Sequence, residues 1–249
     1  MQGYTIAETY TLPSKGKIYT ENVNPVVKLR SMTTEEEMKR LTRSDTPYKV
    51  MCEIIDDCMV EKIGISSYDM CLGDYQFLLH RLRMVTYGSQ YKLANNCKWC
   101  KSQTTEVVNL EDLRVIEYAE GIEKYTELDL PVSKKHITLK MQTPRMLDDI
   151  ALKTKEFKKR TSLADPAFLF TIQSLIDTVD GERLDFVKSE QFARKLPMQD
   201  ANYIIKYGQK LNDSIGIDTE FDITCSVCGL EYHSSFRFTP EFFGPTIDI

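Results

Sequence analysis

Apolar residues spaced three and four positions apart predict a series of amphipathic helices along the chain. After Thr46 and Pro47, which suit a helix N-terminus, one stripe predicts a core-facing helix with the members Val50, Ile54, Ile55, Cys58 and Met59. Thr33 followed three residues later by Glu36 is typical of a capping box and predicts a short helix at 34–42. Comparable stripes predict helices at 69–84, 143–160, 165–176, 189–195 and 200–216. Asp165 and Asp200 are expected to cap two of these helices.

Alternation of apolar and polar residues replaces the helical period elsewhere and predicts strands. Two alternating stretches, 125–130 and 136–141, flank a proline-containing turn and predict a β-hairpin. Further strands are expected at 25–30, 83–87, 90–93, 104–110, 219–224 and 230–238. Helices and hairpins that occupy separate stretches predict an α+β protein.

Two Cys-x-x-Cys pairs, Cys97/Cys100 and Cys225/Cys228, lie between predicted strands. A strand, a cysteine turn and a second strand form one half of a zinc ribbon, and Gly229 suits the second turn. Four thiolates fill a tetrahedral Zn²⁺ shell and leave no position open for water. The pattern therefore predicts a structural rather than a catalytic zinc site.

Such a pair can also act as a redox dithiol. Reactive dithiols usually lie at helix N-termini, whereas strand-like residues follow both pairs here. Replacement of one thiolate ligand by His233, five residues past Cys228, is a weaker alternative. The other three cysteines, Cys52, Cys58 and Cys71, are expected to be small buried apolar residues.

The separation of the two cysteine pairs predicts how the chain is divided. Residues 1–82 would form an N-terminal arm with helices, and 111–216 a mainly helical insertion with the β-hairpin. Residues 83–110 and 217–249 would form a split zinc-ribbon-like β unit with the four cysteines as ligands, and we expect one compact unit overall. Closing the intervening loop costs roughly 4 kcal/mol of chain entropy. Binding of a structural zinc, on the order of 10–16 kcal/mol, exceeds that cost.

Composition and charge exclude several classes of protein. The 249 residues carry a formal net charge of -5 and give a pI near 5.4, which is not the basic balance of a general nucleic-acid binder. The first residues lack the basic and apolar segments of a signal peptide. The sequence contains no run of about 18 apolar residues, so it predicts no membrane span. A reducing compartment is therefore expected for the seven cysteines.

No catalytic motif is evident in the sequence. His80, His136 and His233 are scattered, and there is no glycine-rich phosphate loop, His-Glu-x-x-His or Gly-x-Ser-x-Gly motif. The acidic pairs 56–57 and 148–149 are adjacent in sequence, so on a helix their side chains point about 100° apart and form no carboxylate pair. The sequence therefore predicts a protein that is not an enzyme.

Four short motifs are spread along the chain: Leu12–Gly16, Arg30–Glu37, the two distant cysteine pairs and Glu241–Pro245. Together they resemble the baseplate proteins of T-even-type bacteriophages over nearly the whole chain. The resemblance implies a non-enzymatic assembly factor or component of the central hub of a contractile tail. It implies contacts with other baseplate hub proteins, in the host cytoplasm during assembly or in the virion tail baseplate. The site residues that it carries over are the metal ligands Cys97, Cys100, Cys225 and Cys228.

Two other functions stay open at this point. A zinc-ribbon nucleic-acid binder, for example a late transcription-type protein, would use the basic and aromatic residues beside the first pair, Lys92, Lys98, Trp99 and Lys101. The second pair has acidic neighbours instead. An unrecognised enzyme would need a pocket with perturbed titratable groups. The aromatic ending at 240–245 either packs on the domain or offers a surface to a partner.

Overall fold

The computed structural model describes residues 6–160, 165–235 and 240–243 of the chain. Within these residues, seven α-helices and five small antiparallel sheets give the α+β class that the sequence predicts. The helices are α1 (Thr34–Arg40), α2 (Pro47–Cys58), α3 (Leu72–Tyr87), α4 (Pro144–Arg160), α5 (Ala167–Leu175), α6 (Phe186–Lys195) and α7 (Met198–Asn212). None of the helices in this described part is long and apolar enough to cross a membrane.

The strands are short and pair mostly with near neighbours in the chain. They are β1 (Ala7–Thr11), β2 (Val26–Arg30), β3 (Gln90–Asn96), β4 (Gln103–Asn109), β5 (Val115–Ile116), β6 (Glu127–Asp129), β7 (His136–Leu139), β8 (Ile176–Val179), β9 (Gly216–Ile217), β10 (Glu220–Thr224) and β11 (Glu231–Ser235). The sheets are β1-β2, β3-β4, β10-β11, β5-β9 and β6-β7-β8. A short 3₁₀-helix, η3 (Pro240–Phe243), lies near the C-terminus.

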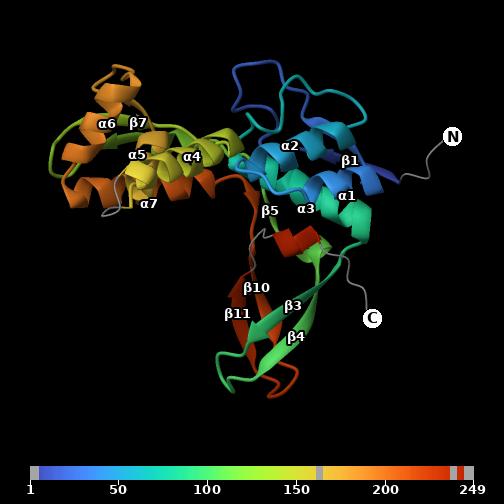
Figure 1. Cartoon of the computed structure of the whole chain (residues 1–249). Helices are drawn as coiled ribbons and strands as arrows, with labels where there is room; N and C mark the ends of the chain where they lie inside the picture. Colours follow the sequence, from blue (N-terminus) through green and yellow to red (C-terminus); the bar gives the residue numbers. More distant parts are fainter. Residues whose placement is uncertain (1–5, 161–164, 236–239, 244–249) are drawn as a thin grey trace.

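Three parts are visible in Figure 1. The N-lobe contains β1, β2 and α1–α3, and the middle lobe contains β6–β8 and α4–α7. The arm contains β3, β4, β10 and β11 and projects away from the place where the two lobes meet. Each part has its own cluster of buried apolar side chains. The division of the chain at residues 82, 110 and 216 stays a prediction.

The motif Leu12–Gly16 is fastened to the first turn of α3. Ser14 is fully buried, and its N–H and hydroxyl donate to the two carboxylate oxygens of Asp74 at 3.0 and 2.5 Å. The hydroxyl of Tyr19 donates to the same carboxylate at 2.6 Å. Gly16 has a φ of +72°, and a Cβ there would lie 2.8 Å from the Val23 carbonyl oxygen. The motif is therefore a structural anchor of the N-lobe.

The capping box predicted at the start of α1 is confirmed. The Thr33 N–H donates to Glu36 at 2.7 Å, and Arg30 donates to the other oxygen of the same carboxylate at 2.6 Å. The Arg30 hydrogen bond is the main cause that lowers the pKa of Glu36 to about 2, against the opposing effect of burial. The Glu36 side chain is 11% exposed, so solvent screens this interaction only partly.

Glu36→Gln is therefore expected to destabilise the N-lobe in a pH-dependent way. A lowered folded-state pKa contributes stability above the unfolded-state value and loses it as pH falls through the folded-state value. We expect the wild-type advantage, roughly 2–3 kcal/mol at pH 7, to shrink between about pH 5 and pH 2. Urea unfolding of both proteins across that range measures the difference. Glu35→Gln, at an exposed neighbour, is the control, and an equal pH dependence in both variants would contradict the assignment.

The prediction of a strand at 83–87 is wrong, because these residues form the last turns of α3. The fully buried guanidinium of Arg83 donates to backbone carbonyls of Gly88, Gln90 and Phe242. Phe242 and Phe243 are themselves buried in the N-lobe core. At these two residues the aromatic ending therefore packs on the N-lobe. The rest of that ending, 244–249, lies outside the described residues, as do residues 236–238 of the last predicted strand.

The predicted hairpin of the middle lobe is confirmed, with Leu128 opposite Ile137. A third strand that the sequence did not predict, β8, joins it through β7. The prediction that Asp200 caps the last helix is wrong. Helix α7 begins at Met198, and the buried Asp200 carboxylate accepts the N–H groups of Val132 and Ser133 at 2.8 and 2.9 Å. It therefore ties the hairpin turn to α7.

The buried carboxylate of Asp148 connects the two lobes. Asp148 on α4 is fully buried and accepts the N–H groups of Tyr48 and Lys49 at 3.3 and 2.8 Å. These are two of the N–H groups that the first turn of α2 leaves without a helical partner. The Tyr68 hydroxyl donates to the same carboxylate at 3.1 Å. One helix thus caps another from 100 residues away in the sequence.

Candidate metal centre

Each cysteine pair lies in a tight turn between the two strands of an arm hairpin. In the first turn, the Cys97 N–H donates to Ser102 and the Cys97 carbonyl accepts from Lys101, at 3.0 and 3.1 Å. In the second turn, Cys225 makes the equivalent bonds with Leu230 and Gly229, at 3.0 and 2.9 Å. The two turns therefore have the same backbone hydrogen-bond pattern. This pattern directs the thiols of both hairpins toward one point.

The structure brings together all four predicted ligands, Cys97, Cys100, Cys225 and Cys228. Their sulfur atoms lie within 4.8 Å of one another. Across the two hairpins, Cys97 Sγ and Cys228 Sγ are 3.8 Å apart, as are Cys100 Sγ and Cys225 Sγ. Four sulfurs about 2.3 Å from a central Zn²⁺ would be about 3.8 Å apart in a regular tetrahedron. The cluster therefore has the donor atoms and the spacing to hold a metal ion.

The thiols of the cluster affect one another electrostatically. Hydrogen bonds from Ser102 and from neighbouring thiols lower the pKa of Cys100 to about 6. The Leu230 N–H favours the Cys228 thiolate, but desolvation and the other three cysteines outweigh it and raise the pKa of Cys228 to about 11. Ionisation of one thiol thus opposes ionisation of another. A bound divalent cation would remove that opposition by neutralising the thiolates.

Packing and polar contacts hold the two hairpins together around the cysteines. Ile223 and Tyr232 are buried beside Cys97 and Cys225 in the arm's own apolar cluster. The Glu106 carboxylate on β4 accepts from the N–H and hydroxyl of Ser226 at 3.1 and 2.8 Å. Sequence reasoning missed Glu106, because only the fold places it beside the second cysteine turn, 120 residues away.

Other candidate residues lie away from the cluster. His233 on β11 faces Asp222 and Glu220 at 3.2 and 3.3 Å, and these acids raise its pKa. His136 is exposed, whereas His80 is buried in the N-lobe, where desolvation lowers its pKa to about 3. The remaining cysteines, Cys52, Cys58 and Cys71, are buried as predicted.

Lys101 and Gly229 occupy the same position in the two turns, and both have left-handed backbones, with φ of +62° and +71°. This conformation costs a side-chain-bearing residue about 1 kcal/mol. We expect Lys101→Gly to stabilise the arm by about 0.5 kcal/mol and Gly229→Ala to destabilise it by about 1 kcal/mol. A Cβ at Gly229 would meet no atom within 4 Å, so backbone conformation alone should set that cost. The chelator concentration that releases half of the metal measures the change in each variant. A shift of this concentration in the same direction for both variants would contradict the equivalence of positions 101 and 229.

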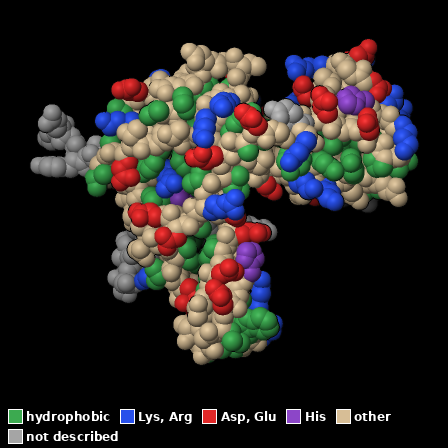
Figure 2. Space-filling view, turned by 180° about the vertical axis from the view of Figure 1, so that it is seen from behind, with side chains coloured by type: hydrophobic (Ala, Val, Ile, Leu, Met, Phe, Trp, Pro, Cys, Tyr) green, Lys and Arg blue, Asp and Glu red, His purple; other side chains and the backbone are tan. Residues whose placement is uncertain are grey.

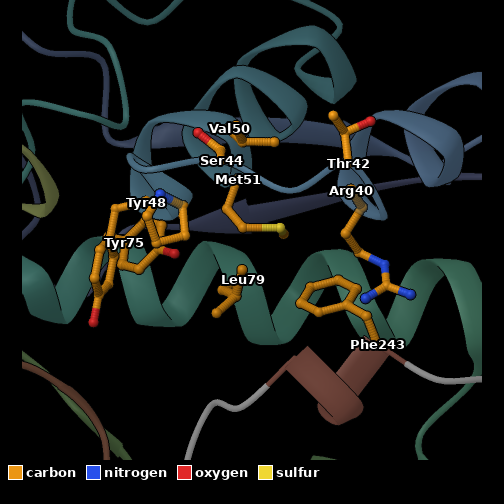
Figure 3. Close-up of a pocket in the computed structure, with 10 residues that line it drawn as sticks. Arg40, Thr42, Ser44, Tyr48, Val50, Met51, Tyr75, Leu79 and Phe243 are labelled. Carbon is orange, nitrogen blue, oxygen red and sulfur yellow. The ribbon is translucent and has the colours of Figure 1, made fainter. Parts of the chain in front are cut away.

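An apolar hollow of about 270 Å³ lies in the N-lobe, between α1, α2, α3 and η3. Figure 3 shows Met51, Leu79 and Phe243 around it. Burial raises the pKa values of its two tyrosines, Tyr48 and Tyr75, and Glu37 raises that of Arg40, its other titratable group. All three groups therefore keep their ordinary ionisation at neutral pH. The hollow supplies no acid or base that titrates in that range.

The fold and the site define an α+β protein with a projecting arm, in which four cysteines could hold a metal ion. The chain belongs to the family described as T4 bacteriophage base plate protein, whose profile matches residues 4–244. The resemblance seen in the sequence is confirmed at the level of this family. No curated protein and no solved structure matches the chain.

Proposed function

We propose that the protein is an assembly factor or component of the central hub of a contractile phage tail baseplate, most like the baseplate hub assembly protein. It acts through protein–protein contacts and not by turnover of a substrate. The observation that carries this proposal is the family match over nearly the whole chain. The protein would meet its partners, the baseplate hub proteins, in the host cytoplasm during assembly, as a late protein or assembly chaperone. It would then leave the hub or stay in the virion tail.

We also propose that one Zn²⁺ is bound by Cys97, Cys100, Cys225 and Cys228 and has a structural role. The sulfur separations of 3.8 Å support this assignment. Four protein thiolates complete a tetrahedral shell, so no position is left for a water or a substrate. The metal would hold the two hairpins of the arm in a fixed relation.

The non-enzymatic part of the proposal is supported by the family and by the chemistry of the described residues. The apolar hollow of the N-lobe has only tyrosines and an arginine as titratable groups. The two histidines that face carboxylates, His136 and His233, are both exposed. Neither lies with a nucleophile in a described pocket.

A knockout of the gene in its phage tests the hub proposal. Infected cells that lack the protein should accumulate tails or baseplate wedges without completed hubs, as seen by electron microscopy. Wild-type protein supplied from a plasmid should restore hub formation and should purify with at least one hub protein. Normal baseplates without the protein, together with no binding to any hub protein, would contradict the proposal.

The nucleic-acid alternative receives less support from the arm. Lys98, Trp99 and Lys101 lie at the first cysteine turn, as a single-strand binder would need. Exposed carboxylates of Glu220, Asp222 and Glu231 lie on the second hairpin and would repel phosphates. Salt-dependent binding of the purified protein to DNA at micromolar concentration would restore this alternative.

A further inference from the structure

The free end of the arm carries an exposed apolar surface. Trp99, Val227 and Leu230 are 62%, 64% and 52% exposed, and all three belong to the two cysteine turns. We call these three residues the tip. Trp99 and Val227 occupy the same position in their turns, two residues after the first cysteine. Figure 2 shows hydrophobic side chains gathered at this end of the arm.

Trp99 is hydrogen-bonded to both hairpins of the arm. The Trp99 indole N–H donates to the Glu231 carbonyl of the other hairpin at 3.0 Å, and the Trp99 backbone N–H donates to Cys97 Sγ at 3.4 Å. These bonds fix the indole ring across the two hairpins and leave most of its surface in water. A large side chain that is already ordered loses little conformational entropy on binding. Tryptophan is also among the residues that contribute most to protein interfaces.

The charges around the tip indicate the kind of partner. Lys98 and Lys101 are exposed beside Trp99, and neither forms an ion pair among the residues that the structure describes. Lys101 Nζ instead donates to the Lys98 carbonyl at 2.9 Å. Both lysines lie on the first cysteine turn, so this side of the tip complements a pocket that is apolar inside and acidic where it faces them.

We infer that the tip is a docking surface for another baseplate protein, which receives Trp99 in an apolar pocket with carboxylates on the side that faces Lys98 and Lys101. This inference rests on the proposed function and identifies the surface through which it would act. The branched side chains of Val227 and Leu230 favour a protein pocket over nucleic acid, since neither can stack on a base.

Titration of the full-length, zinc-loaded protein against each purified baseplate protein of the phage that encodes it tests the inference. Biolayer interferometry gives the affinities. Trp99→Ala should weaken binding to the partner at least about 30-fold. The double variant Lys98→Glu/Lys101→Glu should weaken it about tenfold at low salt and by less at high salt. Val187→Ser, at a 61% exposed valine on α6, is the matched control and should change the affinity less than about twofold.

Zinc content and thermal unfolding of each variant are measured beside the affinity, because Trp99→Ala also removes the indole hydrogen bond to Glu231. The double variant Lys98→Glu/Lys101→Glu leaves that bond in place, so its affinity tests the docking surface independently of the bond. A baseplate protein that binds wild type and Trp99→Ala equally would overturn the inference and leave the proposed function intact. Failure of every baseplate protein to bind the wild type would overturn both. Loss of DNA binding in Trp99→Ala, with protein binding unchanged, would assign the tip to nucleic acid and overturn the docking surface.

Discussion

Cys225→Ser is expected to lose the proposed zinc ion and to unfold the arm, while both lobes keep their helices. Removal of one of four thiolates should weaken metal binding more than about a hundredfold. The arm then retains only a small apolar cluster, in which two of the four buried residues are the cysteines themselves. Two isolated hairpins are marginally stable in water. We expect local stability of the arm to fall by about 4 kcal/mol or more.

Amide hydrogen exchange measures this change position by position. Protection should fall at least about a thousandfold in β10, β11 and the outer half of β3 and β4. It should fall less at the base of β3, because Tyr91 and Leu93 also pack against the N-lobe core. Far-UV circular dichroism should retain its helical signal, since the lobes have separate apolar clusters.

Cys58→Ala is the matched control for thiol loss. Cys58 is fully buried in the N-lobe, so this variant should lower the stability of that lobe and keep one zinc per chain. Metal analysis of the purified proteins separates the two effects. A Cys225→Ser protein that keeps its zinc and its arm protection but loses hub assembly would show that the site is not structural.

The structure lowers the chain-entropy cost of bringing the two cysteine pairs together. From the sequence alone, a zinc ion would have to close the whole stretch between the two pairs. In the fold, Val115 on β5 pairs with Ile217 on β9 at the base of the arm. The ends of the insertion are therefore already adjacent where the arm begins. A zinc ion at the four cysteines would close only the short segments beyond that pairing, which costs less entropy than closing the full loop.

Local patterns predicted the elements whose partners are close in sequence. Alternation predicted the arm hairpins, and the spacing of the cysteines predicted which thiols meet. The pattern failed for 83–87, where β-branched and aromatic residues favour a strand. Those residues are helical in the fold, where the buried side chain of Arg83 donates to the Phe242 carbonyl, 159 residues later. No local window contains that contact.

Buried acids were the second group whose partners the sequence did not predict. Asp148 belongs to an acidic pair typical of a solvated face or a cap, and it does cap a helix, but one 100 residues away in the sequence. Asp200 precedes an apolar stripe as a cap would, but its carboxylate accepts backbone N–H groups of the hairpin turn 67 residues away. Because a buried carboxylate needs donors from whatever packs against it, its role depends on tertiary structure.

Gly73→Ala should be the most destabilising glycine substitution at the base of the arm. Gly73 lies in the first turn of α3, where a Cβ would be 2.1 Å from the Ile215 carbonyl oxygen and 2.7 Å from its carbon. These are backbone atoms and cannot rotate away. Gly216 beside them has a φ of +130°, and a Cβ there would lie 2.9 Å from the Gly73 Cα. We expect a net loss of roughly 3 kcal/mol and a fall in Tm of about 6–12 °C.

Gly208→Ala is the matched control, because Gly208 also lies in a helix and has a close neighbour. There the nearest atoms are the two terminal methyl carbons of Leu175, at 2.6 and 2.7 Å, and a leucine side chain can change rotamer. Alanine also favours the helix by about 1 kcal/mol over glycine. Gly208→Ala should therefore stay within about 1 kcal/mol of wild type, and equal effects of the two substitutions would contradict the backbone contact.

Gly73→Ala should also differ from Cys225→Ser in what it preserves. Gly73 contacts Ile215 and Gly216 just before β10, whereas the cysteines lie in the turns at the other ends of the arm strands. The variant should therefore keep the proposed zinc ion. Strand β9 leads directly into β10, and displacement of β9 would change the angle of the arm on the lobes. We therefore expect hub assembly to weaken although the tip is intact. Zinc loss in Gly73→Ala would instead mean that the arm depends on its base for metal binding.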